Sequence, residues 1–164
     1  MIEDDLTRLR ALRAAGQHDE YLAEAVALAA RAPGSTAAQI EAAYACDRFG
    51  AEHDAIRYYD AAWRLGVPPG ERLHFVVGYG STLRNLGRAD EAVALLAEAA
   101  SDHADYPPLR AFLSLALLSA GHPRAAVAAL LGLVLDLAPA DALDGYQRAL
   151  GAYYRELLEP EAVL

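Results

Sequence analysis

The sequence lacks lysine altogether and has a single cysteine. Cys46 cannot form a disulfide within the chain, and its small and apolar neighbours favour a core residue over a reactive thiol. All 14 basic residues are arginine, and alanine is abundant, which indicates the coding bias of a GC-rich bacterial genome. Because 23 acidic residues outnumber them, for a net charge of −9, the chain is poorly suited to neutralising phosphates. We therefore expect no nucleic-acid partner and no binding to an anionic membrane surface.

Long apolar runs are also missing. The longest one, Ala125 to Leu135, is far shorter than the roughly 20 residues that a membrane-spanning helix needs. The chain begins with Met-Ile-Glu-Asp-Asp, whereas a secretory signal would be basic and then apolar. We therefore expect no membrane partner and a cytoplasmic location.

Motifs for catalysis and metal binding are absent from the sequence. No histidine stands at metal-ligand spacing from another histidine or from cysteine, and there is no phosphate-binding glycine loop. No Gly-x-Ser-x-Gly motif of a serine nucleophile occurs either. The sequence thus predicts no enzyme activity, no cofactor and no metal. Three of the five histidines, His18, His53 and His122, fall at the turns between helices and are interpreted as solvated turn residues.

Four glycines recur at nearly regular intervals. Gly16, Gly50, Gly87 and Gly121 are separated by 34, 37 and 34 residues. Each lies between two apolar helical stretches, and glycine readily takes the left-handed conformation that follows a helix C-terminus. The second stretch starts near an acid or a proline, which suits a helix N-terminus. The period predicts four helix–turn–helix units, at about residues 2–34, 35–69, 70–106 and 107–139, within one domain over 1–164.

A further helix is predicted over residues 141–158, with Asp141 as its N-cap. Its apolar residues recur at spacings of 3, 4, 3 and 4, which gives one stripe: Leu143, Tyr146, Leu150, Tyr153 and Leu157. The preceding helical stretch is unusually apolar, and we expect the last helix to cover it. The alternative is that this apolar surface forms a homodimer.

The repeated unit resembles the tetratricopeptide repeat. The third unit carries the best match, Gly-Ser-Thr-Leu-Arg-Asn-Leu-Gly-Arg-Ala-Asp-Glu-Ala-Val over residues 80–93. Together with Leu-Arg-Ala-Phe-Leu-Ser-Leu-Ala-Leu over residues 109–117, it is similar to the bacterial subfamily called tetratricopeptide repeat group 5. The resemblance implies an all-α, right-handed solenoid of four repeats, here with a C-terminal capping helix. It also implies recognition of a protein or peptide in a concave groove lined by the first helix of each repeat.

By this resemblance, groove positions lie 13, 10, 6, 3 and 2 residues before each turn glycine. They collect arginines in an otherwise acidic protein, beside aromatic and amide side chains, and they become apolar in the fourth unit. The predicted partner-binding residues are Arg10, Arg13, Tyr44, Arg48, His74, Ser81, Arg84, Asn85, Leu115 and Leu118.

Arginine binds carboxylates through two parallel hydrogen bonds, and tyrosine offers a rigid amphipathic contact. We therefore hypothesise that the groove takes an acidic or C-terminal peptide segment, with an apolar residue docking at the fourth unit. One alternative is that the arginines pair within the fold, with Glu3, Glu41 and Asp47. The other candidate function is a structural homo-oligomer assembled through the apolar fourth repeat and the C-terminal helix.

Overall fold

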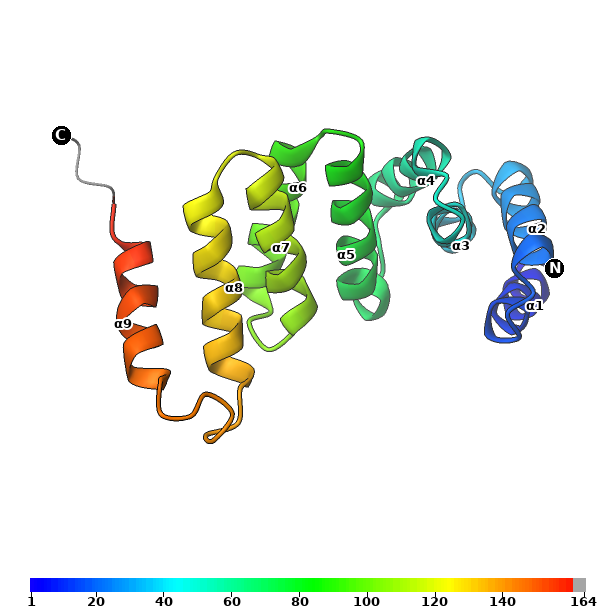
Figure 1. Ribbon diagram of the computed structural model, residues 1–164. Coiled ribbons are helices and arrows are strands. Elements are labelled where there is room, and N and C mark those ends of the chain that lie inside the picture. The colour runs from blue at the N-terminus through cyan, green and yellow to red at the C-terminus, as the bar shows by residue number, and fades with distance from the viewer. Residues whose placement is uncertain (161–164) are drawn as a thin grey trace.

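The computed structural model describes residues 1–160. Over these residues the regular secondary structure is α-helical (Figure 1). Eight of them form four consecutive hairpins, which we call units 1 to 4. The helices are α1 (Ile2–Ala14), α2 (His18–Arg31), α3 (Thr36–Arg48), α4 (Glu52–Leu65), α5 (Pro69–Asn85), α6 (Ala89–Asp102), α7 (Pro107–Ser119), α8 (Pro123–Leu137) and α9 (Gln147–Leu158). The units follow one another from the blue N-terminal end to the red α9 in Figure 1. The predicted all-α repeat solenoid is confirmed.

The turn inside each unit is built in the same way. All four predicted turn glycines have positive φ angles, from 68° to 82°. In each turn the residue after the glycine donates its backbone N–H to the carbonyl five residues earlier, at 2.9 to 3.0 Å. This hydrogen bond closes the helix C-terminus in the manner of a Schellman motif, which requires a left-handed residue at the glycine position. The glycine period therefore marks the same turn four times.

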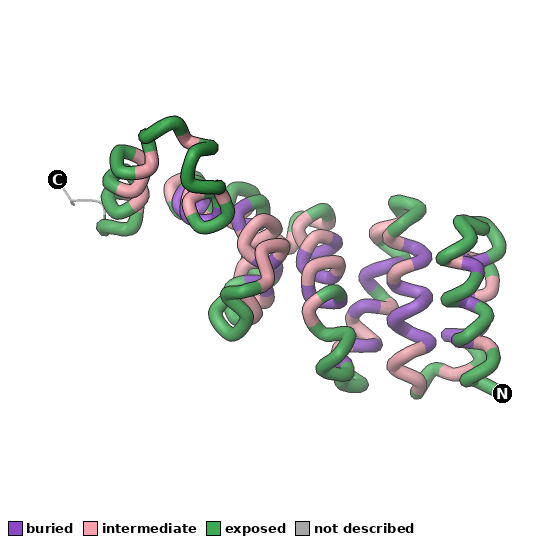
Figure 2. Tube along the Cα trace, turned by 90° about the horizontal axis from the view of Figure 1, so that it is seen from below, coloured by how far each residue is buried: buried purple, intermediate pink, exposed green. Residues whose placement is uncertain are grey.

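The core lies between the helices of units 1 to 3 and the first helix of unit 4. Aromatic rings fill the space between units 2 and 3: the ring centroid of Tyr59 is 5.2 Å from that of Phe75 and 5.5 Å from that of Tyr79. Cys46 is buried in the same core, as expected. Burial raises the pKa of its thiol to about 11, which disfavours the reactive thiolate. Figure 2 shows the buried residues in purple along these units, while α9 has none.

The last helix differs from its prediction. It begins at Gln147 rather than at residue 141, because Asp144 and Gly145 take positive φ angles of 46° and 83°, which no helix accommodates. Asp141 is therefore not its N-cap, and the predicted stripe is only partly correct. Tyr146 and Tyr153 are 66% and 60% exposed. The half-buried residues of α9 are instead Gln147, Leu150, Gly151, Tyr154 and Leu157.

The expectation that this helix covers the apolar last hairpin is confirmed only in part, because α9 packs on α8 but leaves one apolar side of it exposed. Four large aliphatic side chains of α8 stay between 41% and 58% exposed: Val127, Leu130, Val134 and Leu137.

Candidate functional site

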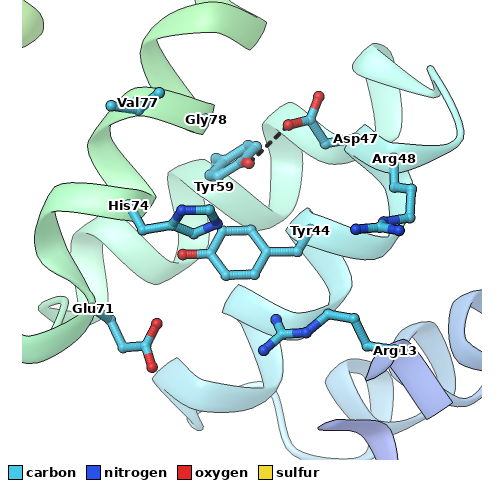
Figure 3. Close-up of a pocket in the computed structure, with 9 residues that line it drawn as sticks. All are labelled: Arg13, Tyr44, Asp47, Arg48, Tyr59, Glu71, His74, Val77 and Gly78. Atoms are coloured by element: carbon cyan, nitrogen blue, oxygen red, sulfur yellow. Dashed lines mark hydrogen bonds between the residues drawn. The ribbon is translucent and has the colours of Figure 1, made fainter. Parts of the chain in front are cut away.

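An open pocket of about 700 Å³ lies between the first helices of units 1 to 3 (Figure 3). Arg13 comes from α1, and α5 supplies its far wall. One residue, Tyr59, reaches the pocket from the second helix of unit 2. The lining is Arg13, Tyr44, Asp47, Arg48, Tyr59, Glu71, His74, Val77 and Gly78.

The structure brings four of the ten predicted site residues together in this pocket: Arg13, Tyr44, Arg48 and His74. The other six lie outside its lining. Arg10 lies on α1, Ser81, Arg84 and Asn85 follow at the C-terminal part of α5, and Leu115 and Leu118 are exposed on α7.

Two of the arginines pair within the fold. The carboxylate of Glu41 is buried, with a side chain 6% exposed, and lies 3.3 Å from Arg13 Nη1 and 3.8 Å from Arg10 Nε. The hydroxyl of Tyr21 also donates a hydrogen bond to this carboxylate, at 2.7 Å. Internal pairing through Glu41 therefore holds for Arg10 and Arg13. Within residues 1–160, neither Glu3 nor Asp47 has an arginine within 4.0 Å.

Arg48 and Arg84 behave differently. Over the described part of the chain, neither guanidinium has a carboxylate within 4.0 Å. Arg84 donates to the side-chain oxygen of the neighbouring Asn85 at 2.9 Å. Arg48 lines both the pocket and an adjoining hollow of about 340 Å³ beside His18 and Phe49. Its charge is therefore available to a ligand in either space.

Tyr44 lies at the centre of the pocket. Its ring contacts the His74 ring edge to face, at 5.1 Å between centroids, and the Arg13 guanidinium lies 5.9 Å from the ring centre. Its hydroxyl is buried, and among residues 1–160 it has no hydrogen-bond partner. Burial, followed by the negative charge of Glu71, raises the pKa of this phenol above its ordinary value. The hydroxyl therefore stays protonated at neutral pH and keeps an unused donor, which buried polar groups rarely do.

The back of the pocket is a hydrogen-bonded wall. Asp47 accepts bonds from the Tyr59 hydroxyl at 3.1 Å and from Thr82 Oγ1 at 3.4 Å (Figure 3 shows the first). Burial raises the pKa of Asp47, while these two hydrogen bonds oppose the rise. Gly78 leaves the space that the Tyr59 hydroxyl occupies, because a Cβ at this position would overlap it. The wall thus depends on a glycine inside α5.

Some of the missed lining residues carried a signal in the sequence. Asp47 and Val77 stand three and ten residues before their turn glycines, at positions expected to face the groove. Glu71 stands 16 residues before Gly87, outside that set, and Tyr59 belongs to a second helix. An acidic residue opposite the arginines was therefore not expected, and it makes the pocket polarised rather than uniformly positive.

Two kinds of site have no support in the structure. Residues 1–160 contain no group of three histidine, cysteine or acidic side chains placed to hold a metal ion. Over the same residues, no helix is long and apolar enough to cross a membrane.

Comparisons with known proteins relate the chain to one repeat family. The model of a family described as Tetratrico peptide repeat, of the group 5 type, matches residues 36–157. No curated protein sequence matches the chain.

Two solved structures share the fold. The first is YrrB, described as a TPR protein with an unusual peptide-binding site: the TM-score is 0.70 at 17% identity, over 94% of this chain and 78% of that one. The second is TTC0263, a thermophilic TPR protein of Thermus thermophilus, with a TM-score of 0.56 at 24% identity, over 92% of this chain and 77% of that one. At these identities the likeness concerns the fold.

Proposed function

The chain belongs to the tetratricopeptide repeat family, and on this premise we propose that it is a non-catalytic interaction module that binds an acidic peptide segment of a partner protein. The binding site is the pocket between units 1 and 3. The observation that carries the proposal is Arg48, a pocket cation with no carboxylate within 4.0 Å over residues 1–160. YrrB, which shares the fold, is described as having a peptide-binding site, and this supports a peptide as the ligand.

A ligand carboxylate fits at the arginine side of the pocket. In Figure 3, Arg13 lies below the Tyr44 ring and Arg48 lies on the side of Tyr44 away from its hydroxyl. Arg13 shares its charge with Glu41, so Arg48 supplies the larger part of the attraction. A guanidinium binds a carboxylate through two parallel hydrogen bonds, which adds directional specificity to the charge attraction.

The opposite side of the pocket selects a hydrogen-bond donor. Glu71 lies on the side to which the Tyr44 hydroxyl points (Figure 3), and its negative charge contributes to the raised pKa of that hydroxyl. A second acidic group there would be repelled. A backbone N–H or a basic side chain of the peptide would instead donate to the carboxylate of Glu71. The peptide is therefore expected to place an acidic residue at Arg48 and a donor group near Glu71.

The test uses synthetic peptides. Random decapeptides retained by the immobilised protein are sequenced, and the best one is measured by calorimetry beside its version with glutamine in place of the acidic residue. Enrichment of acidic peptides is expected, with a loss of roughly tenfold or more in affinity for Arg48→Glu and for the glutamine peptide.

Arg64→Glu is the matched control, since it makes the same charge change at an exposed position of α4 outside the pocket. Equal affinities of the wild type, Arg48→Glu and Arg64→Glu would refute the role of Arg48. Retained peptides without acidic residues would refute the acidic ligand.

A structural homo-oligomer is the second candidate function. It is favoured by a separate observation, the cluster of exposed aliphatic side chains on α8. Because these residues lie outside the pocket lining, self-association and peptide binding are compatible in one molecule.

A further inference from the structure

The side chains that stack one unit on the next stand at fixed positions from the turn glycine. In the second helices, positions 6, 9 and 13 after the glycine face the following unit. Tyr59, at position 9 of unit 2, is fully buried against Phe75 of α5, and Trp63, at position 13, lies 6.2 Å from the same ring. In unit 3, position 9 is Leu96, which is also fully buried.

Two positions of the first helices also face the next unit, namely those 6 and 3 residues before the glycine. Arg13 reaches Glu41 of α3. Tyr44 packs on His74 of α5, and the Asp47 carboxylate accepts a hydrogen bond from the same helix. Units 1 and 2 therefore use these positions for contacts with their successors.

In unit 4 the same positions are all aliphatic and exposed. They form what we call the open stacking face, together with Leu137, one helical turn beyond position 13. The exposed fractions are 43% for Leu115, 58% for Leu118, 54% for Val127, 49% for Leu130, 41% for Val134 and 58% for Leu137. The matching positions 9 in units 2 and 3 are 0% exposed. Unit 4 thus carries the side chains of a stacking interface without its partner.

Helix α9 packs on another side of α8. The Arg124 guanidinium donates to the backbone oxygens of Glu156 and Leu157, and Gly132 of α8 lies against the Tyr154 ring. Arg124 stands three residues after its turn glycine, a position that is exposed in each of the three preceding units. The helix therefore covers a side of α8 that faces solvent elsewhere, and it leaves the open stacking face uncovered.

The other end of the solenoid is closed by charges. Gln39 and Ala42 of α3 are buried at positions 11 and 8 before their glycine, and Gln39 donates a hydrogen bond to α2 of the preceding unit. The same positions in unit 1 are Asp5 and Arg8. Asp5 pairs with Arg31 at 3.3 Å, and Arg8 pairs with two glutamates of α2. An aliphatic surface stacked on this end would remove these ion pairs from water, which is costly.

We propose that the open stacking face binds a second copy of this chain, so that two molecules associate tail to tail through their fourth units. A two-fold interface brings the same patch of both copies together, so it must complement itself. An uncharged aliphatic face meets this requirement, whereas the charged N-terminal end makes head-to-tail stacking unfavourable. The inference rests on the second candidate function, and specifies its surface and symmetry.

The size of the face suits a dimer. Its six side chains expose roughly 500 Å² of aliphatic surface in each copy, a patch of the size that marks interaction sites on monomers. One partner buries roughly 800 Å² in a specific complex, so these six side chains would supply the larger part of such an interface. The peptide pocket lies in units 1 to 3, so the dimer presents two pockets and can bind two segments of one partner.

The experiment is analytical ultracentrifugation of the full chain over a concentration series. Leu130→Glu places a carboxylate at the centre of the face, where it would be buried without a partner in each copy. Dimerisation is expected to weaken by roughly a hundredfold or more. Tyr153→Glu makes a similar change at an exposed position of α9 and is expected to leave the dimer intact. Far-ultraviolet circular dichroism checks that both variants keep their helices.

A cross-linking variant supports the assignment independently of charge. Leu130→Cys is expected to form a disulfide-linked dimer under mild oxidation, since the α8 part of the open stacking face would meet its own copy near the two-fold axis. Tyr153→Cys is expected to stay monomeric on a denaturing gel. The native Cys46 is buried and does not interfere.

Each outcome decides between the proposals. A dimer lost in Leu130→Glu and kept in Tyr153→Glu supports the tail-to-tail arrangement. Loss of the dimer in Tyr153→Glu alone would refute the role of the open stacking face. The homo-oligomer function would then remain possible through an interface on α9. A wild type that stays monomeric at every concentration would overturn both, and open-ended polymers would indicate head-to-tail stacking. None of these outcomes changes the peptide-binding test of Arg48.

Discussion

Units 1 to 3 and unit 4 share one helical hairpin but meet different surroundings. Leu96 in unit 3 and Leu130 in unit 4 occupy the same position after their turn glycines, yet Leu96 is fully buried and Leu130 is 49% exposed. The difference comes from the presence or absence of a following first helix in the right place. A repeat therefore does not bury its own apolar face, because its neighbour has to do so.

The two ends of the solenoid also differ in the side chains at their stacking positions. The N-terminal end of the solenoid carries ion pairs at its stacking positions, whereas unit 4 carries aliphatic side chains at its own. A charged end suits solvent, and an aliphatic end suits a partner. The comparison teaches that the two ends of one array can differ in chemistry, and the proposed dimer assigns association to the aliphatic end.

The largest expected difference is between two identical substitutions at equivalent positions. Leu96→Ala should lower the free energy of unfolding by about 2–5 kcal/mol, because it leaves a cavity in the core. Leu130→Ala should lower it by about 1 kcal/mol or less in the monomer, since half of the side chain is already in water. Urea unfolding measures both losses, at a protein concentration at which the chain is monomeric. Equal losses would mean that the fourth unit is packed as tightly as the third.

Two glycines extend the comparison to close packing. A Cβ on Gly80 would lie 2.8 Å from the Leu96 Cγ, in the middle of a buried side chain. Gly80→Ala is therefore expected to cost about 1–3 kcal/mol from overpacking, less about 1 kcal/mol from the better helix propensity of alanine.

Gly132→Ala serves as its counterpart in unit 4. A Cβ there would meet the end of the flexible Arg110 side chain of α7 and the Tyr154 ring of α9. The ring can shift because α9 contains no buried residue. The net change is expected to be near zero, within about 0.5 kcal/mol. Thermal unfolding of both variants checks the pair, and a large loss in Gly132→Ala would show that α9 is held more rigidly than its burial indicates.

A local effect is expected at α9. Arg124→Ala removes the hydrogen bonds that the guanidinium donates to the last carbonyls of this helix, each worth about 1 kcal/mol. Trypsin should then cleave faster after Arg148 and Arg155, while the unfolding of units 1 to 3 stays the same. Arg57→Ala, exposed on α4, is the control. Unchanged cleavage at α9 would argue against the anchoring role of Arg124.

The last expected effect concerns the dependence of stability on pH. Because burial raises the pKa of Asp47 in the folded chain, the native state holds this proton more tightly than the unfolded state. The contribution to stability is therefore fully present below the unfolded pKa and is lost as the pH rises through the folded one. Asp47→Asn has no such dependence, so the stability of the wild type relative to this variant should fall as the pH rises above the ordinary pKa of an aspartate. A constant difference between the two would contradict the raised pKa.

Most of the fold follows from the sequence because the turns repeat. The glycine period identifies every hairpin, and each glycine has the expected left-handed conformation. The start of the last helix could not be found in this way, since the apolar spacing of residues 141–158 continues through a segment that Asp144 and Gly145 turn out of the helix. Periodicity alone does not register a local backbone reversal.

The candidate site was predictable where it depends on the first helices alone. Arg13, Tyr44, Arg48 and His74 meet in one pocket because they occupy groove positions of consecutive units. The contribution of Tyr59 was not predictable, since it depends on the space left by Gly78 in another helix. Similarly, the open stacking face results from the place where α9 docks on α8, which is a tertiary contact that the spacing of its own apolar residues does not encode.

The most direct test of the open stacking face is hydrogen exchange of the wild-type protein at two concentrations, one below and one above the dissociation constant of the proposed dimer. The account predicts that raising the concentration slows exchange in peptides from α7 and α8, while peptides from units 1 to 3 and from α9 keep their rates. Slower exchange confined to α9, or no change anywhere, would contradict the claim that the fourth unit ends in a surface that a second copy covers.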